Sequence, residues 1–522
     1  MSYDVVVAGG GPVGLMLACE LALGGASVVV LERLTEIDQT VKAGSLNTPS
    51  VDALYRRGLL PALSAAQEET IAGIVKPGGA KGGPKGAPKF AGHFGGIVLR
   101  GDLIDPADPD LGGNGPGDNV KLVSQQQLEW ILGVRAAELG IEVRRGVELT
   151  GFEADQDGVT VTTTRGPVRG SWLVGCDGGR SAVRKLAGFD FPGTAPEVTA
   201  YQAMAKMENT QDLRMGWNAT PTGVYAHGPF PERILTVEFD GVPKDRDAPV
   251  TPEELQASIR RVTGAPVVVT DIRTATRFTD NARQASTYRK GRVLLAGDAA
   301  HVHSPFGGQG LNLGLGDAMN LGWKLAATVR GHAPEDLLDT YTAERHPIGA
   351  WVLEWTRAQI AVMRPDPHAR AMRAVVAALA GTVAGTTYFV KQISGVWQHY
   401  DIPGDHPLTG GSAPDLELAD GSRLADHLHT GRALLLDPSG QLTASVYGYR
   451  DRIEVVEGPV AELPQLAGLL VRPDGFVAWA ADAGRTDPAS LEAALSAWLG
   501  APAVTGAGGN PEAGAQPVGT VR

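Results

Sequence analysis

Cysteine is scarce in this chain, because only Cys19 and Cys176 occur among its 522 residues. The two do not form a CxxC or CxxxxC pair, which excludes the dithiol chemistry of disulfide oxidoreductases. Sparse, unpaired cysteines are typical of reduced intracellular proteins, so we predict two small core residues. We predict no metal site.

The chain also lacks an uninterrupted apolar stretch of about 20 residues, the length that crosses a membrane. The run from Val5 to Leu23 is largely apolar, but Asp4 precedes it, glycines interrupt it and no basic segment leads it. These features argue against a signal peptide. We therefore predict a cytoplasmic protein.

Positive charge is in the minority, with 46 Lys and Arg against 58 Asp and Glu and a net charge of −12. This balance disfavours nucleic acid and anionic membranes, and we predict neither as a partner. The apolar fraction of 43% is ordinary for a globular enzyme. The length predicts about two to four domains. Monomer and homodimer both stay open.

The N-terminal segment has the pattern of a βαβ unit. Tyr3–Ala8 and Ala26–Leu31 are short, apolar and β-branched, which predicts two buried strands, and Pro12–Leu23 between them has a helical pattern. The turn from Gly9 to Gly14 reads GGGPVG, a GxGxxG motif whose glycines let the backbone approach a pyrophosphate at the helix N-terminus. Glu32 ends the second strand, where a carboxylate can accept hydrogen bonds from ribose hydroxyls. The segment therefore predicts dinucleotide binding.

Two later glycine-rich motifs follow further predicted strands. Residues 173–181 read LVGCDGGRS, and residues 291–301 read GRVLLAGDAAH before PFGGQGLN at 305–312. A buried strand that ends in Gly-Asp places a carboxylate at the carboxyl edge of the sheet, where ligands bind. The helical run Leu311–Arg330 then offers its first amides to an electron-rich ligand edge. Either motif alone is compatible with a capping aspartate, whereas the three in this order favour one extended cofactor.

Together with YTAERHP at 341–347, these motifs resemble the GxGxxG, DG, GD and ERxP elements of the class A flavoprotein monooxygenases, the fold family of p-hydroxybenzoate hydroxylase. Within that family the chain is most similar to bacterial aromatic-polyketide hydroxylases and to the rifampicin monooxygenase type. The resemblance covers about residues 1–400, and the part up to about 502 resembles the thioredoxin-like domain of larger members, without redox cysteines.

The resemblance implies an α/β fold: a Rossmann-type FAD-binding domain, an inserted mixed-sheet substrate domain and a C-terminal thioredoxin-like domain. The glycine- and proline-rich composition of residues 73–117 predicts a flexible surface loop. Leu338–Val362 and Ala369–Ala384 have the pattern of long helices. The expected boundaries are 1–72, 118–189 and 288–400 for the FAD-binding domain, 190–287 for the substrate sheet, 401–502 for the C-terminal domain and 503–522 for a disordered tail.

The resemblance also implies residues that hold FAD tightly and non-covalently. Glu32 and Arg33 would bind the ADP half, Asp298 the ribityl chain, and the main chain at Leu311 and Asn312 the pyrimidine edge of the flavin. For Asp177, both contact with FAD and a purely structural role stay open. The full expected set is Gly9, Gly11, Val13, Gly14, Glu32, Arg33, Lys42, Gln125, Leu149, Asp177, Asp298, Gly310, Leu311 and Asn312.

Three positions depart from the family pattern. Lys42 stands where an arginine usually lies beside the flavin, which keeps the charge and loses the bidentate fork. Ser304 and Phe306 replace the usual small or proline residues before Gly307, and Pro49 replaces a common arginine. These departures bear on flavin mobility and substrate shape.

By resemblance, NADPH reduces FAD, O2 adds to give a flavin hydroperoxide, and its distal oxygen passes to a large aromatic substrate of polyketide or antibiotic type. The chain has no second strand–GxGxxG–helix unit, so NADPH is expected to be a transient co-substrate.

Other interpretations stay open at this point. Baeyer–Villiger oxygenation of a polyketide uses the same fold and cofactor, and a non-catalytic FAD-binding scaffold is the non-enzymatic alternative. The WxWxIP signature of flavin halogenases is absent. His93 and His301 are candidates for assisting phenol deprotonation, because histidine titrates near working pH. A structural role fits both as well, so the catalytic acid–base residue is unknown.

Overall fold

The computed structural model describes residues 2–74, 89–111, 115–117, 121–228, 232–243, 245, 248–485 and 487–503. The lysine-rich segment 75–88 and residues 504–522 of the predicted tail lie outside these ranges. The predictions of flexibility and disorder made for them are therefore not tested.

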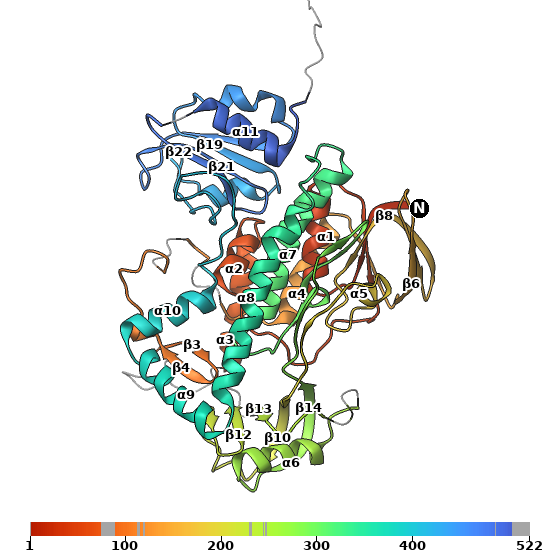
Figure 1. The fold of residues 1–522 in the computed structure, drawn as a ribbon, viewed down its shortest axis with the longest axis vertical. Coiled ribbons are helices and arrows are strands. Elements are labelled where there is room, and N and C mark those ends of the chain that lie inside the picture. The colour runs from red at the N-terminus through yellow and green to blue at the C-terminus, as the bar shows by residue number, and fades with distance from the viewer. Residues whose placement is uncertain are drawn as a thin grey trace, which may run out of the picture.

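The N-terminal half is built on an eight-stranded sheet (Figure 1). Its central strands run parallel, and the middle of β1 is buried on both faces of the sheet, with Val5, Val6 and Val7 fully buried. The carboxyl ends of β1, β8 and β17 therefore meet at one edge, where the three glycine motifs follow. The strands, in sheet order, are β16 (Arg289–Lys290), β17 (Val293–Leu295), β8 (Gly166–Gly175), β1 (Ser2–Ala8), β2 (Val28–Glu32) and β5 (Glu142–Arg145), with β6 (Leu149–Ala154) and β7 (Val159–Thr163) joined to β8.

Helix α1 (Pro12–Leu23) follows β1 and packs between α7 (Gln309–Val329) and α4 (Gln125–Glu138). The predicted strand–helix–strand unit is thus confirmed. Helices α1 and α7 pack closely at Gly322, where a side chain would not fit: a Cβ there would lie 2.3 Å from the Cβ of Glu20. Shorter helices complete this region: α2 (Thr48–Tyr55), α3 (Leu60–Ile74) and α5 (Ala182–Leu186).

A second, five-stranded sheet lies at the opposite end of the molecule from the C-terminal domain (Figure 1). One face packs on α6 (Pro252–Thr263) through Ile234 and Ile259, and the other face carries Leu235 and Val237 toward Phe306. Its strands, in order, are β11 (Gly216–Ala219), β12 (Gly223–His227), β13 (Arg233–Glu238), β10 (Thr199–Glu208) and β14 (Val268–Phe278). Strands β9 (Gly193–Thr194), β15 (Ala282–Gln284) and β18 (His301–Val302) form a small linking sheet.

The described part of segment 73–117 differs from its prediction. It contains a hairpin, β3 (Phe90–Phe94) and β4 (Ile97–Arg100), so the expectation of an irregular loop is wrong there. The hairpin buries Phe94, Ile97 and Leu99 against helices that follow much later in the chain. Composition alone does not report such long-range burial.

Three helices pack around this hairpin: α8 (Thr340–Met363), α9 (Pro367–Ala380) and α10 (Val383–Ser394). The predicted single helix Ala369–Ala384 is wrong because the chain breaks after Ala380, where Thr382 caps α10 by accepting from the Gly385 amide. Among the described residues, no single helix has the length and apolar composition of a membrane span; α9 and α10, bent by 100°, meet both criteria only when taken as a pair.

The C-terminal domain has a four-stranded sheet of order β20-β19-β21-β22, with β19 and β20 parallel and the other pairs antiparallel. This is the thioredoxin-like arrangement that the resemblance implies. It contacts the rest of the chain through Arg57, which donates to the carbonyls of Leu428 and Pro473. Its elements are β19 (Ala433–Asp437), β20 (Ile453–Glu457), β21 (Leu466–Val471), β22 (Val477–Asp482) and α11 (Pro488–Leu499).

Candidate FAD site

The turn after β1 is closed so tightly that side chains would not fit. A Cβ at Gly9, whose φ is +109°, would lie 2.3 Å from the carbonyl oxygen of Cys176, and a Cβ at Gly14 would lie 1.9 Å from the carbonyl oxygen of Gly9. Gly11 faces the other way, with no protein atom within 4 Å of its Cβ position. Gly11 is also the N-cap of α1 and makes no side-chain cap bond. The turn therefore presents the free amides of a helix N-terminus to open space, which suits a phosphate group.

The predicted acidic residue lies beside this turn. Glu32 accepts hydrogen bonds from the amide of Gly10 at 2.6 Å and from the amide of Leu34 at 2.8 Å. Each carboxylate oxygen has a further lone pair for a ribose hydroxyl. Arg33 is exposed on the adjacent surface.

The GD motif lies against the glycine turn that follows β1. A Cβ at Gly297 or Gly314 would lie 3.1 or 2.6 Å from Cγ2 of Val13, so the third motif and α7 close on the first turn. Asp298 follows in a short 3-10 helix, and its side chain is exposed. Its carboxylate lies near Gly310, because a Cβ there would be 3.8 Å from Oδ1.

Helix α7 begins in the same way as α1. Its N-cap, Gly308, has a left-handed φ of 64° and no side-chain cap bond, so the amides around Gly310 and Leu311 stay open to a ligand. Asn312 holds the segment around Asn47 against the start of α7, because its Oδ1 accepts from the Asn47 amide at 2.9 Å. The side-chain amide of Asn312 also donates to the Gly308 carbonyl at 2.7 Å.

The segment before Asn47 and the start of α4 complete the site. The Gln125 amide donates to the Ala43 carbonyl at 2.9 Å, which places Gln125 beside the 43–47 segment. Lys42 pairs with Asp38 at 2.8 Å on the exposed rim, so its charge is shared. Burial would raise the pKa of Asp38, but the bonds to Lys42 and Thr40 outweigh it and lower that pKa.

Asp177 shows the structural role that the sequence left open. Its Oδ2 accepts from the amides of Ala182 at 2.6 Å and Val183 at 3.1 Å and so holds the first turn of α5. Its Oδ1 is buried with no hydrogen-bond partner among the described residues. Leu149 lies half-buried at the start of β6, where its backbone pairs with that of Thr163 in β7.

His301 belongs to a buried ion network that sequence reasoning missed. Its Nε2 lies 2.7 Å from Asp317, which also accepts from Nε of Arg345 at 2.8 Å and from the Gly297 amide at 3.0 Å. Burial would raise the pKa of Asp317, but the charges of His301 and Arg345 outweigh it and lower that pKa. Arg345 is the arginine of the ERxP element, so that motif was the available signal. The network orients the strand end before Asp298 and leaves His301 buried away from a substrate.

His93 lies instead in an aromatic cluster. Its ring centroid is 4.3 Å from that of Trp217, and Trp217 is 6.1 Å from Phe306. Burial, with the charges of Arg233 and Arg373, lowers the pKa of His93 to about 4. The imidazole of His93 is therefore neutral at pH 7.

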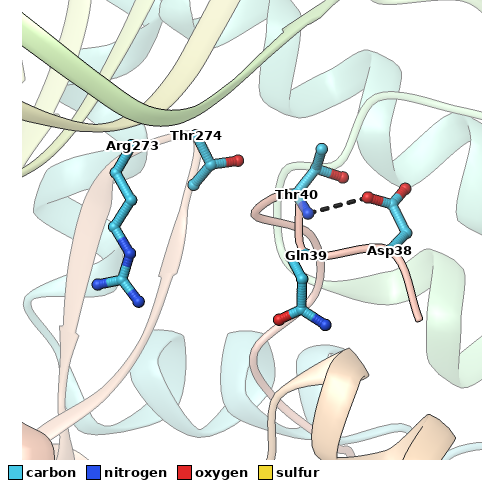
Figure 2. A pocket seen from close by; sticks show the side chains of 5 residues that line it. All are labelled: Asp38, Gln39, Thr40, Arg273 and Thr274. Carbon is cyan, nitrogen blue, oxygen red and sulfur yellow. Dashed lines mark hydrogen bonds between the residues drawn. The ribbon is translucent and has the colours of Figure 1, made fainter. Parts of the chain in front are cut away.

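A cavity of about 370 Å³ separates the loop after β2 from the substrate sheet, as Figure 2 shows. Gln39 and Thr40 line one side, and Arg273 and Thr274 of β14 line the other. The Thr40 amide donates to Asp38 at 2.9 Å, which holds the loop in place. Polar groups from both domains therefore face each other across this cavity.

The three glycine turns thus converge on one edge with open amides, an exposed carboxylate and no room for side chains on the protein side. These features fit an extended dinucleotide such as FAD. The chain matches the FAD binding domain family over residues 2–356 and the aromatic-ring hydroxylase C-terminal family over residues 406–502, and it belongs to both. It is a flavoprotein monooxygenase of the aromatic-ring hydroxylase class.

Relatives named as monooxygenases align with this chain over nearly their whole length. The 12-dehydrotetracycline 5-monooxygenase/anhydrotetracycline 6-monooxygenase of Streptomyces rimosus is 42% identical, covering 97% of this chain and 100% of that protein. A rifampicin monooxygenase of Streptomyces venezuelae is 40% identical, covering 96% and 99%. The solved structure of OxyS anhydrotetracycline hydroxylase from Streptomyces rimosus matches with a TM-score of 0.83 at 40% identity, covering 96% of this chain and 100% of that one.

Proposed function

We propose that this protein uses NADPH and O2 to hydroxylate a bulky polycyclic aromatic substrate of polyketide or antibiotic type. One observation carries the proposal: the aromatic face of the substrate sheet lies against the loop that leads into α7. Phe306, in that loop, is 6.1 Å from Trp217 and 5.9 Å from Phe278 between ring centroids. A flat apolar substrate would pack on such a face and lie close to the cofactor edge.

Two groups of residues have separate roles: one binds the cofactor, and the other excludes water from the site. When bound, FAD supplies electron transfer from NADPH to O2 and the oxygen-transfer chemistry. Asp298 would accept hydrogen bonds from its hydroxyls, and the open amides at the start of α7 would favour negative charge at their end of the flavin. Phe306, which is 3% exposed, and its aromatic neighbours exclude water from the reacting region.

The names of the relatives support a multi-ring substrate. Anhydrotetracycline and rifampicin are large, oxygen-rich aromatic molecules, and the proteins that are named for them align with this chain almost end to end.

The test is turnover by the purified, FAD-loaded protein. NADPH and O2 consumption are followed across polycyclic phenols and quinones, and products are identified by mass. We expect ligand-stimulated NADPH oxidation and a product heavier than its substrate by one oxygen atom. Turnover of single-ring benzoates alone would contradict the multi-ring substrate, and NADPH oxidation indifferent to every aromatic ligand would favour the scaffold.

Baeyer–Villiger insertion adds the same mass, so the product's connectivity separates the two reactions. A ring-retained phenol supports hydroxylation, whereas a lactone or its ring-opened acid supports insertion. Hydroxylation is favoured here because the aromatic-ring hydroxylase domain accompanies the FAD domain.

A further inference from the structure

Arg233 is a cation that lacks a counter-ion in the described part of the chain. It begins β13, and none of the described residues forms a hydrogen bond, ion pair or ring contact with its guanidinium. Its side chain is half-buried, and burial lowers its pKa. A partly desolvated guanidinium without a partner is costly, so such a group is normally paired or holds a ligand.

The side chain of Arg233 lies on the face of the sheet that meets the FAD-binding domain. Side chains alternate along a strand, so Arg233 shares its face with Leu235 and Val237. Both of these pack in the cluster that contains Phe306, whereas Ile234 packs on the α6 side. Arg233 is therefore directed toward the aromatic substrate face.

Two further donors lie close to it. Trp217, Ala226 and Leu235 lie opposite one another across three strands, so Arg233 shares the face of the sheet that carries Trp217, whose ring centroid is 4.3 Å from that of His93. Burial, with the charges of Arg233 and Arg373, lowers the pKa of His93. The Gly96 amide donates to Nδ1 of His93 at 3.3 Å, so the neutral ring carries its proton on Nε2. Arg373 donates to the Gly95 carbonyl at 2.5 Å.

His93, Arg233 and Arg373 form a group of two charged guanidiniums and one neutral ring, which we call the cationic cluster, in a chain whose net charge is −12. Arg233 and Arg373 have no ion pair with any described acidic residue, and burial is the cause of the lowered pKa of each. Trp217 stacks beside His93 and supplies an aromatic surface next to the charge.

We infer that the cationic cluster is a subsite for a delocalised oxyanion on the aromatic substrate, such as a carboxylate or the ionised enol of a 1,3-dicarbonyl. A guanidinium matches the two oxygens of such a group in a bidentate pair. The inference rests on the proposed function for the identity of the ligand, and it assigns which end of that ligand points at β13.

The test uses ligand binding rather than turnover. Anthraquinone-2-carboxylate and 2-methylanthraquinone are titrated into the FAD-loaded protein, and the quenching of tryptophan fluorescence is followed. We expect the carboxylate to bind at least about tenfold more tightly than the neutral ring, since hydrogen bonds to charged groups are worth that much. Arg233→Met should abolish this preference, and Arg233→Lys should restore part of it.

Arg214→Met is the matched control, because Arg214 is an exposed arginine of the same domain. It should keep the full preference. Equal binding of both ligands by the wild type, failure of the wild type to bind either, or a preference retained in Arg233→Met would overturn the subsite. A loss of NADPH affinity in Arg233→Met with the ligand preference intact would assign the cluster to a phosphate of NADPH and overturn it as well. Failure of hydroxylation alone would leave these binding results standing and count against the proposed function only.

Discussion

The two ends of α7 satisfy their polar groups in opposite ways. At the N-terminal end the cap is a glycine without a side-chain bond, and Asp298 beside it is exposed. At the C-terminal end, Nζ of Lys324 donates to Asn320 and Glu344 at 2.8 Å each, and Arg472 of the C-terminal domain pairs with Glu344 at 2.7 Å.

The difference separates binding from stability within one helix. Open polar groups at the first end are available to a cofactor, while the closed network at the second end joins two domains. Substitutions should therefore affect FAD affinity at one end and unfolding at the other. Four predictions test this division between cofactor binding and stability.

The largest effect is expected for Arg472→Met. Arg472 is 1% exposed and bonds to Glu344 and Asp474, so its loss leaves buried Asp474 without a cation and Glu344 with Lys324 alone. We expect the free energy of unfolding to fall by about 3–5 kcal/mol. Urea unfolding, followed by tryptophan fluorescence, measures it. The control Arg432→Met removes an exposed pair with Glu454 and should cost no more than about 1 kcal/mol. Equal losses in the two variants would refute the closed network.

Asp298→Ala should act on the cofactor instead. Removing an exposed carboxylate that forms no hydrogen bond with the described residues should weaken FAD binding by about tenfold to a hundredfold, the worth of a hydrogen bond to a charged group. The melting temperature of the FAD-free protein should stay unchanged. Fluorescence titration of apoprotein with FAD measures the affinity, with exposed Asp339→Ala as control. A fully yellow Asp298→Ala protein would contradict the assignment.

Two alanine substitutions in the glycine turn, at Gly14 and at Gly11, should have contrasting effects. Gly14→Ala meets the Gly9 carbonyl at 1.9 Å and should cost about 1–3 kcal/mol of stability even without FAD. Gly11→Ala meets no protein atom within 4 Å, so it should leave the apoprotein stable and weaken FAD binding. Thermal melting of both apoproteins and FAD titration distinguish the two. Similar melting losses would show that Gly11 is not at an open face.

The smallest effect is a pH dependence at the closed end. Burial, with the charge of Arg472, lowers the pKa of Lys324 to about 7, below its value in the unfolded chain. The unfolded state then binds more protons above pH 7, so stability from this group rises with pH. Between pH 7 and 8 the wild type should gain about 1 kcal/mol relative to Lys324→Met. Urea unfolding at both pH values measures it, and a constant difference would place the lysine pKa outside this window.

Local patterns sufficed for much of the cofactor site. The strand Ser2–Ala8, the turn from Gly9 and the helix Pro12–Leu23 follow from alternation of apolar runs with glycine, all within one short segment. The same reasoning was wrong for Phe90–Arg100, because its apolar residues pack on α8 and α10 rather than on their sequence neighbours. The composition of this segment indicated its many glycines, but it could not indicate that Phe94, Ile97 and Leu99 are buried against distant helices.

The sequence alone determined the glycine turn after the first strand and the acidic residue beside it, because glycine conformation and strand periodicity act over a few residues. Only the tertiary structure decided that Asp177 holds the first turn of α5, that Arg345 pairs with Asp317 and that no described residue pairs with Arg233. Electrostatic pairing depends on distance in space, and residues far apart along the chain meet only once the sheets and helices have packed.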